Sequence, residues 1–188
     1  MTMPPSVPTL RTERLDLRAI RAEDFDAWAE AAADETTMSF LGGPQPRSVA
    51  WRGFVGVAGS WAIQGFGMFS VVERASGRWI GRVGPHRPEG WPGTEVGWMI
   101  VRDVWGRGYA GEAAAACMDY AVDTLGWSEI IHCIDAGNVA SQGVAKHLGS
   151  RLTRTARMPA PFENDIDVWS QTADDWRAFK TSRRRATA

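Results

Sequence analysis

The sequence predicts an α+β domain, in which helices pack against a sheet that is not purely parallel. Segments that alternate polar and apolar residues recur along the chain and indicate half-buried strands. Between them, apolar residues at three- and four-residue spacing indicate amphipathic helices. Two of the strands follow each other directly across a short glycine turn. Such a hairpin is foreign to a doubly wound parallel sheet and favours the α+β class.

The first half of the chain begins with a strand and a helix. Residues 14–20 (RLDLRAI) alternate as a strand, and residues 22–34 (AEDFDAWAEAAAD) place acids in a first turn and apolar residues on one face. A second helical pattern covers residues 47–63. Residues 65–74 and 78–84 then read as the two strands of the hairpin, joined by the turn ASG.

The second half alternates strands with helices. The expected elements are a strand at 94–101, a helix at 110–125, a strand at 129–135, a short helix within 138–149, and strands at 151–157 and 165–171. A length of 188 residues fits one domain with a core of its own. We assign that domain to residues 10–180, with a flexible N-terminus at 1–9 and a disordered basic tail at 181–188.

Composition excludes several classes of function. The net charge of −1 gives no electrostatic footprint for nucleic acid. The three histidines lie far apart, so no metal site is expected, and the two cysteines read as small buried apolar residues. Neither a signal peptide nor a membrane-spanning segment is visible, so we expect a cytoplasmic protein without membrane partners.

The stretch WGRGYAGEA, residues 105–113, contains a G-x-G-x-x-G pattern in front of the predicted helix 110–125. Glycines let a backbone turn tightly around a ligand, and a helix N-terminus presents unpaired N–H groups to an anion. The same pattern opens dinucleotide-binding folds, and Asp135 lies at the spacing of a ribose-binding acid. In those folds, however, the glycines follow the first strand of the sheet, whereas several strands precede them here.

Three segments in order along the chain resemble the signatures of the GCN5-related N-acetyltransferases, the GNAT superfamily. They are TERLDLRAI with Asp24 downstream, EVGWMIVRDVWGRGYAGEA, and NVASQGVAKHLG. The resemblance is strongest to the branch that includes the ribosomal-protein N-terminal acetyltransferases. It implies a mixed, mostly antiparallel sheet of six to seven strands with a splayed parallel pair, flanked by about four helices.

The resemblance also implies acetyl-CoA as cofactor. The loop would wrap the pyrophosphate with backbone N–H groups, strand 94–101 would offer backbone groups to the pantetheine amides, and Asn138 and Ser141 would lie along the arm. The implied cofactor-binding residues are Met99, Ile100, Val101, Trp105, Gly106, Arg107, Gly108, Tyr109, Ala110, Gly111, Asn138 and Ser141. For Asn138, the chemistry of the residue supports a helix cap equally well.

The implied reaction is direct acetyl transfer to an amine. Glu95 is the candidate for steering or deprotonating the amine, with a buried structural carboxylate as the alternative, and Ser141 is the candidate near the sulfur. Many relatives carry a tyrosine acid where this chain has Ala145. They also read Gly-Phe where it has Gly149 and Ser150.

For the acceptor we expect an apolar or peptide-like amine beside Trp51, Trp98 and Phe162, with simple core filling as the alternative for the tryptophans. Two other functions remain open from the sequence: a CoA-binding module without turnover, and a nicotinamide-dependent oxidoreductase. Both a monomer and a homodimer fit the sequence.

Overall fold

The computed structural model describes residues 6–186 and divides the chain into two compact units. The first unit comprises Met1–His86 and Gly97–Cys117, and the second comprises Arg87–Val96 and Met118–Ala188. Strand β5 (Glu95–Ile100) and helix α4 (Tyr109–Asp123) each run from one unit into the other.

The fold is α+β, with a mixed, mostly antiparallel sheet of eight strands that contains one parallel pair, and with six α-helices within residues 6–186. Both numbers exceed those expected. The difference lies in short or charged elements: β1 (Leu10–Arg11) and α2 (Glu35–Met38) are too short to show a period, and helix α6 (Ala173–Ala186) is rich in charge.

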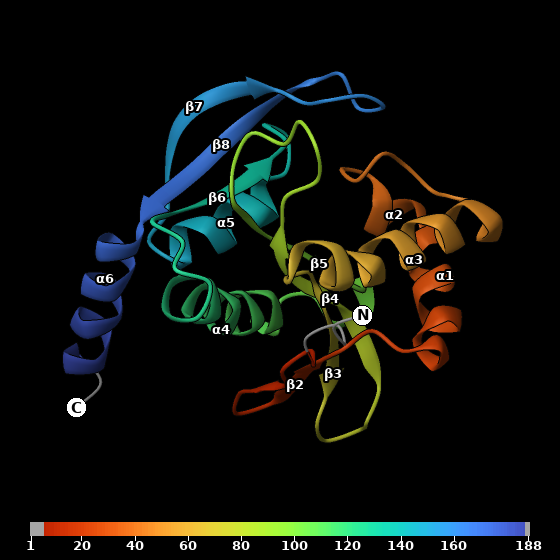
Figure 1. Ribbon diagram of the computed structural model, residues 1–188, viewed down its shortest axis with the longest axis horizontal. Coiled ribbons are helices and arrows are strands. Elements are labelled where there is room, and N and C mark those ends of the chain that lie inside the picture. Colours follow the sequence, from red (N-terminus) through yellow and green to blue (C-terminus); the bar gives the residue numbers. More distant parts are fainter. Residues whose placement is uncertain (1–5, 187–188) are drawn as a thin grey trace. The chain divides into compact units, whose positions relative to one another are not determined.

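In the first unit the strands follow the order β1-β2-β3-β4-β5. Strands β2 (Leu15–Arg18), β3 (Phe69–Glu73) and β4 (Trp79–His86) pair antiparallel, as the predicted hairpin requires. Helices α1 (Phe25–Ala33) and α3 (Arg47–Gln64) pack together with α2 as the group of orange to gold helices in Figure 1. Two 3-10 turns complete the unit, η1 (Ala22–Asp24) and η2 (Arg102–Val104).

Aromatic side chains fill the core of the first unit. Trp28, Phe54 and Trp79 are buried in one cluster with Met99 of β5. The rings of Trp28 and Phe54 meet edge to face with centroids 5.3 Å apart. Such pairs add about 0.5–1.5 kcal/mol beyond the area that they bury. Trp28 belongs to the helix predicted at residues 22–34, and its burial shows that the apolar face of this helix lies in the core.

In the second unit the strand order is β5-β6-β8-β7. Strand β6 (Glu129–Ile134) is parallel to β5, with Glu95 opposite Ile131, and antiparallel to β8 (Asp165–Thr172). Strand β7 (Arg151–Arg157) pairs antiparallel with β8, and helix α5 (Val139–His147) connects β6 to β7. Figure 1 shows β7 and β8 in blue, followed by α6.

The two ends of the chain differ in how much of them the structure describes. Residues 1–5 and 187–188 lie outside the described residues, and residues 6–9 have no regular structure. Helix α6 continues to Ala186 and so includes residues 181–186 of the expected tail. Phe179 packs against Gly149, and Arg183 donates to the His147 carbonyl at 3.2 Å. The disorder of the tail stays a prediction.

Candidate active site

The glycine loop lies where the sequence predicts it, at the N-terminus of α4. Gly106 and Gly108 have φ angles of 75° and 79°, which favour glycine, and residues 105–108 are exposed. The first backbone bond of the helix joins the Glu112 N–H to the Gly108 carbonyl at 3.1 Å. The N–H groups of the residues just before Glu112 therefore precede the hydrogen-bond ladder of the helix. Together with the helix dipole, these donors suit an anion.

Strand β5 ends beside this loop with its backbone groups directed to two sides. The Val101 N–H donates to the Ile80 carbonyl of β4 at 3.0 Å, whereas the Ile100 carbonyl accepts from Trp105 Nε1 at 2.7 Å. Neighbouring residues of a strand direct their backbone groups to opposite sides. Of the three residues expected to serve the pantetheine arm, Ile100 is therefore the one whose peptide faces away from β4.

Glu95 is buried, with only 6% of its surface exposed, and both carboxylate oxygens accept hydrogen bonds. Its Oε2 atom accepts from Trp91 Nε1 at 2.5 Å, and its Oε1 atom accepts from the Cys133 N–H at 2.9 Å. This is the geometry of the structural alternative for Glu95. It leaves the catalytic role a prediction.

Side chains replace the backbone ladder between β5 and β6 just beyond Glu95. The Ile131 N–H donates to the Thr94 carbonyl at 3.0 Å, so the next pair of a regular parallel ladder would join the Cys133 N–H to the Val96 carbonyl. Instead, Cys133 donates to the Glu95 carboxylate, and Val96 accepts from His132 Nδ1 at 2.7 Å. The backbone ladder between β5 and β6 thus gives way to side-chain bonds at Cys133 and Val96.

His132 is held in one tautomer by a buried chain of hydrogen bonds. A carbonyl can only accept, so His132 Nδ1 must carry the proton that points to Val96. Burial lowers the pKa of His132 from 6.5 to about 4, so the ring is neutral at pH 7. His132 Nε2 then accepts from the Ser150 hydroxyl at 3.0 Å, and Ser150 Oγ accepts from Gln171 Nε2 at 2.8 Å.

The same hydrogen-bond network explains why Ser150 stands where many relatives have phenylalanine. This residue is 3% exposed and partners His132, so the hydroxyl supplies a hydrogen bond where an aromatic ring would fill space. Aromatic packing here comes from α6 instead, because a Cβ atom at Gly149 would lie 2.8 Å from the Phe179 ring. His132 and Gln171 gave no signal in the sequence, because their partners lie 18 or more residues away.

Helix α5 bears the remaining predicted cofactor residues. Asn138 caps it, because its Oδ1 atom accepts from the Ser141 N–H at 3.0 Å, which confirms the capping alternative. Contact of Asn138 and Ser141 with the pantetheine arm stays a prediction. Ala145 is fully buried, and its carbonyl accepts from the Ser150 N–H at 3.0 Å.

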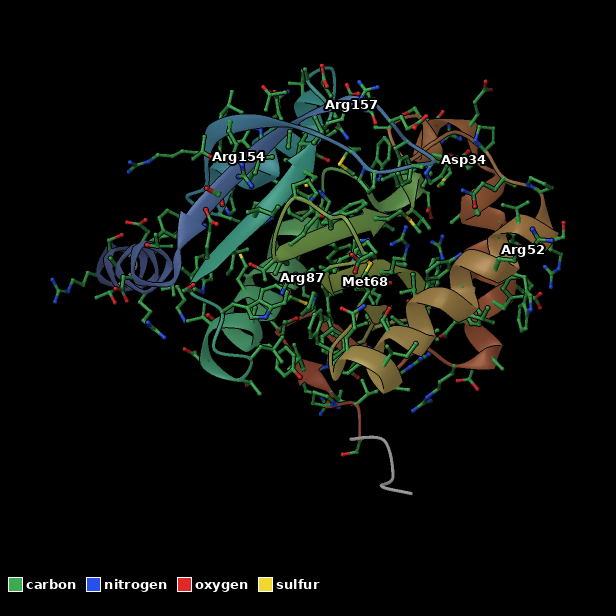
Figure 2. The ribbon with its side chains drawn as sticks, turned by 45° about the horizontal axis from the view of Figure 1, so that its top comes forward. Asp34, Arg52, Met68, Arg87, Arg154 and Arg157 are labelled. Atoms are coloured by element: carbon green, nitrogen blue, oxygen red, sulfur yellow. The ribbon has the colours of Figure 1, made fainter. Side chains whose placement is uncertain are left out.

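The three predicted acceptor residues have different surroundings. Phe162 is 45% exposed, and its ring meets the Trp91 ring edge to face with centroids 6.3 Å apart. Since Trp91 also donates to Glu95, the indole links Phe162 to the carboxylate. Arg154, labelled in Figure 2, holds the loop of Trp91 by donating from Nη2 to the Pro92 carbonyl at 2.9 Å. Trp51 packs on Phe25 while 46% of it stays exposed, and Trp98 is half-buried on β5.

Metal and thiol chemistry find no support within residues 6–186. No three His, Cys, Asp or Glu side chains gather there in a way that could hold a metal ion. Burial raises the pKa of both thiols, Cys117 and Cys133, so each stays protonated at neutral pH. Across the same residues, no helix combines the length and the apolar character needed to cross a bilayer.

Comparisons with known proteins agree on one family. The family model of the acetyltransferase (GNAT) domain matches residues 14–151. An acetyltransferase of Agrobacterium tumefaciens strain C58 has a similar structure, with a TM-score of 0.79, 32% identity, and coverage of 91% of this chain and 98% of that one. A putative ribosomal-protein-serine acetyltransferase of Vibrio cholerae shares the fold, with a TM-score of 0.74, 22% identity, and coverage of 91% and 99%.

The uncharacterized protein YkkB of Bacillus subtilis is 35% identical over 95 residues. That match covers 50% of this chain and 55% of YkkB, so the chain matches only about half of that relative. The family match itself covers both the glycine loop and the strand of Glu95. The chain belongs to the GNAT family of acetyltransferases, which take the acetyl group from acetyl-CoA.

Proposed function

We propose that this protein transfers the acetyl group of acetyl-CoA directly to a primary amine. The observation that carries the proposal is the exposed glycine loop, which opens α4 with left-handed turns at Gly106 and Gly108. Its donor set fits a pyrophosphate, because N–H groups without helical partners and a positive dipole end converge there. When bound, acetyl-CoA supplies an acetyl group activated as a thioester.

Different parts of the chain would hold different parts of this cofactor. Residues 105–111 would bind the pyrophosphate, and the Ile100 peptide would meet an amide of the pantetheine arm, since its carbonyl is on the side away from β4. Asn138 and Ser141 are proposed for the arm from the family resemblance. We propose the Ile100 N–H as the backbone donor for a developing oxyanion, because it lies on the same side of β5 as the Ile100 carbonyl.

Two observations favour direct transfer over an acyl-enzyme on cysteine. The buried thiols of Cys117 and Cys133 have raised pKa values, which removes the thiolate that such a route needs. The backbone N–H of Cys133 also donates to the Glu95 carboxylate, so this residue helps to position Glu95 through its main chain and not through its thiol. We propose that the Glu95 carboxylate steers the incoming amine, with a water as the intermediate base.

For the acceptor we propose a small-molecule amine or a protein N-terminus with an apolar neighbour. Trp91 contacts both Glu95 and the exposed ring of Phe162, so an apolar wall lies next to the buried carboxylate. Rings of this kind suit an apolar side chain adjacent to the reacting amine. A ribosomal-protein N-terminus is one member of this class, and the similar Vibrio cholerae structure is described as a putative ribosomal-protein-serine acetyltransferase.

Calorimetric titration with acetyl-CoA, with NAD in parallel, tests the cofactor. Saturable binding of acetyl-CoA and silence from NAD are expected. Acetyl transfer to a panel of amines and N-terminal peptides, with and without an apolar first residue, then tests the reaction. Binding without transfer to any acceptor would favour the second candidate, a CoA-binding module, for which Ala145 in the place of a tyrosine acid is the supporting observation.

A further inference from the structure

Arg14, in the turn between β1 and β2, reaches the glycine loop from 93 positions away in the sequence. Its Nη1 atom donates to the Arg107 carbonyl at 2.9 Å, and its guanidinium lies over the Tyr109 ring, 4.6 Å from the centroid. A Cβ atom at Gly108 would lie 3.5 Å from Arg14 Nη2. One side chain therefore contacts Arg107 and Tyr109 and lies close to Gly108 between them, all within the first unit.

Glu112 fixes Arg14 in this position. Arg14 Nε donates to Glu112 Oε2 at 2.6 Å, and the Arg14 N–H and the Thr12 hydroxyl both donate to Glu112 Oε1, at 2.9 and 2.5 Å. Burial alone would raise the pKa of Glu112, but these hydrogen bonds from Thr12 and Arg14 outweigh it and lower the pKa. The carboxylate stays charged and ties the β1–β2 turn to the first turn of α4.

The direction of the Arg107 peptide decides what a phosphate would meet at this loop. Arg107 lies between two glycines with positive φ, so its carbonyl could take more than one direction. A carbonyl oxygen that faces a phosphate repels it, whereas an N–H group attracts it. Arg14 draws this oxygen to itself, which keeps it out of the way of an anion at the N–H groups of the loop.

We propose that Arg14 is a positioning residue for the cofactor: it sets the peptide orientation of the phosphate-binding loop, and Glu112 holds it in place. The inference rests on the proposed function, because it assumes that the loop receives the pyrophosphate. The β1–β2 turn thereby contributes to the affinity for the phosphates of CoA. Affinity for the pantetheine arm does not depend on Arg14.

The test compares two ligands that differ in their phosphates. CoA and pantetheine are titrated separately into the wild type, Arg14→Met and Arg14→Lys, with dissociation constants from calorimetry or NMR. We expect Arg14→Met to weaken CoA binding about tenfold, the effect of one hydrogen bond to a charged group, and to leave pantetheine binding unchanged. Lysine is a point charge without the fork and should restore CoA affinity only in part.

Arg11→Met is the matched control. Arg11 lies in the same hairpin and pairs with Asp16 at 2.8 Å, so its loss removes a similar ion pair from the same element. CoA affinity should stay within about twofold of the wild type, since exposed ion pairs contribute little and Asp16 keeps a second partner in Arg74. Thermal midpoints of all variants report folding independently of the ligand.

A double-mutant cycle tests the role of Glu112. If Glu112 acts through Arg14, Glu112→Gln should weaken CoA binding less than Arg14→Met does, and the double variant should bind no worse than Arg14→Met. Losses that simply add would overturn this part of the inference.

The two proposals fail in different ways. A wild type that binds neither CoA nor pantetheine overturns the proposed function and this inference with it. A wild type that binds CoA, beside a folded Arg14→Met that binds it equally well, overturns the inference alone. An equal loss for CoA and pantetheine also overturns it, because the effect would then be a general loss of structure.

Discussion

Glu95 combines two demands on a single residue, since it holds a strand in place and is the candidate base. Its Oε1 atom replaces a backbone acceptor for Cys133, and its Oε2 atom accepts from Trp91. Glutamine in its place could still accept from Cys133 through its amide oxygen, but its NH₂ group would face the indole N–H of Trp91. Glu95→Gln should therefore lose one hydrogen bond together with the negative charge.

A pair of variants separates these two contributions. Glu95→Gln should lower kcat about 100-fold with little change in KM for acetyl-CoA, the size of effect usual for a lost general base. Trp91→Phe removes the same indole hydrogen bond but keeps the carboxylate, so its kcat should stay within a few-fold of the wild type. Equal losses of kcat in steady-state assays of both variants would assign Glu95 a structural role only.

Gly108 is the glycine of the loop that combines a left-handed conformation with a position close to Arg14. With φ at 79°, alanine there costs about 1–2 kcal/mol or shifts the turn, although its Cβ would find ordinary contact distance to Arg14. We expect Gly108→Ala to weaken CoA binding at least tenfold in calorimetry. Gly77→Ala is the control: it has a similar φ of 70° and open space in the β3–β4 turn, so it should cost similar stability and leave CoA affinity unchanged.

At the scale of elements, hydrogen bonds made by side chains connect β5, β6 and the end of α5. Ser150 links His132 to Gln171, and Gln171 also donates to the Leu148 carbonyl at the end of α5 at 2.9 Å. The histidine in turn donates to Val96 of β5. A defect at Ser150 should therefore be felt in three elements of the second unit.

Ser150→Ala tests this network. It leaves His132 Nε2 without its buried donor, which should lower the free energy of unfolding by about 1–3 kcal/mol in denaturant titrations. Ser182→Ala makes the same chemical change on the exposed face of α6 and should stay within about 0.5 kcal/mol of the wild type. Equal stability of the two variants would mean that the chain of hydrogen bonds contributes nothing to the fold.

At the scale of the whole molecule, His132 and His86 make the free energy of unfolding depend on pH. Burial lowers the pKa of His132 and of His86 to about 4 each, from an ordinary value of 6.5. Below pH 6.5 these two histidines therefore bind protons in the unfolded chain, whereas in the folded chain they stay neutral down to about pH 4. The stabilisation is complete above pH 6.5 and is lost as the pH falls from 6.5 to 4.

Urea titrations between pH 4.5 and 7.5 measure this dependence. Each histidine contributes a slope of up to about 1.4 kcal/mol per pH unit, since one proton is taken up on unfolding. His132→Gln should remove about that slope, whatever it does to stability at pH 7. His86→Gln should remove a similar slope, because burial lowers the pKa of His86 to about the same value, and the double variant should lose both. An unchanged slope in His132→Gln would contradict the assignment of a buried neutral ring.

The sequence by itself determined the α+β class, most element positions and the glycine loop. Local patterns suffice for these features, because a strand or helix reports its buried face through the spacing of apolar residues, and a tight turn reports itself through glycine. Three ordered signatures also gave the family, which the match over residues 14–151 confirms. The last helix, α6, was not predicted, because its many charged residues give no sign of the contacts that Phe179 and Arg183 make in the fold.

Only the tertiary structure decided which side chains meet. Arg14 and Glu112 are 98 positions apart, Glu95 and Cys133 are 38 apart, and His132 and Val96 are 36 apart. The fold brings these partners together, and a period of two determines only which face of a strand is buried, since a slip of two residues keeps the same face. For the same physical reason the sequence named Glu95 but left two roles open for it, and the hydrogen bonds that now define its surroundings could be read only from the folded chain.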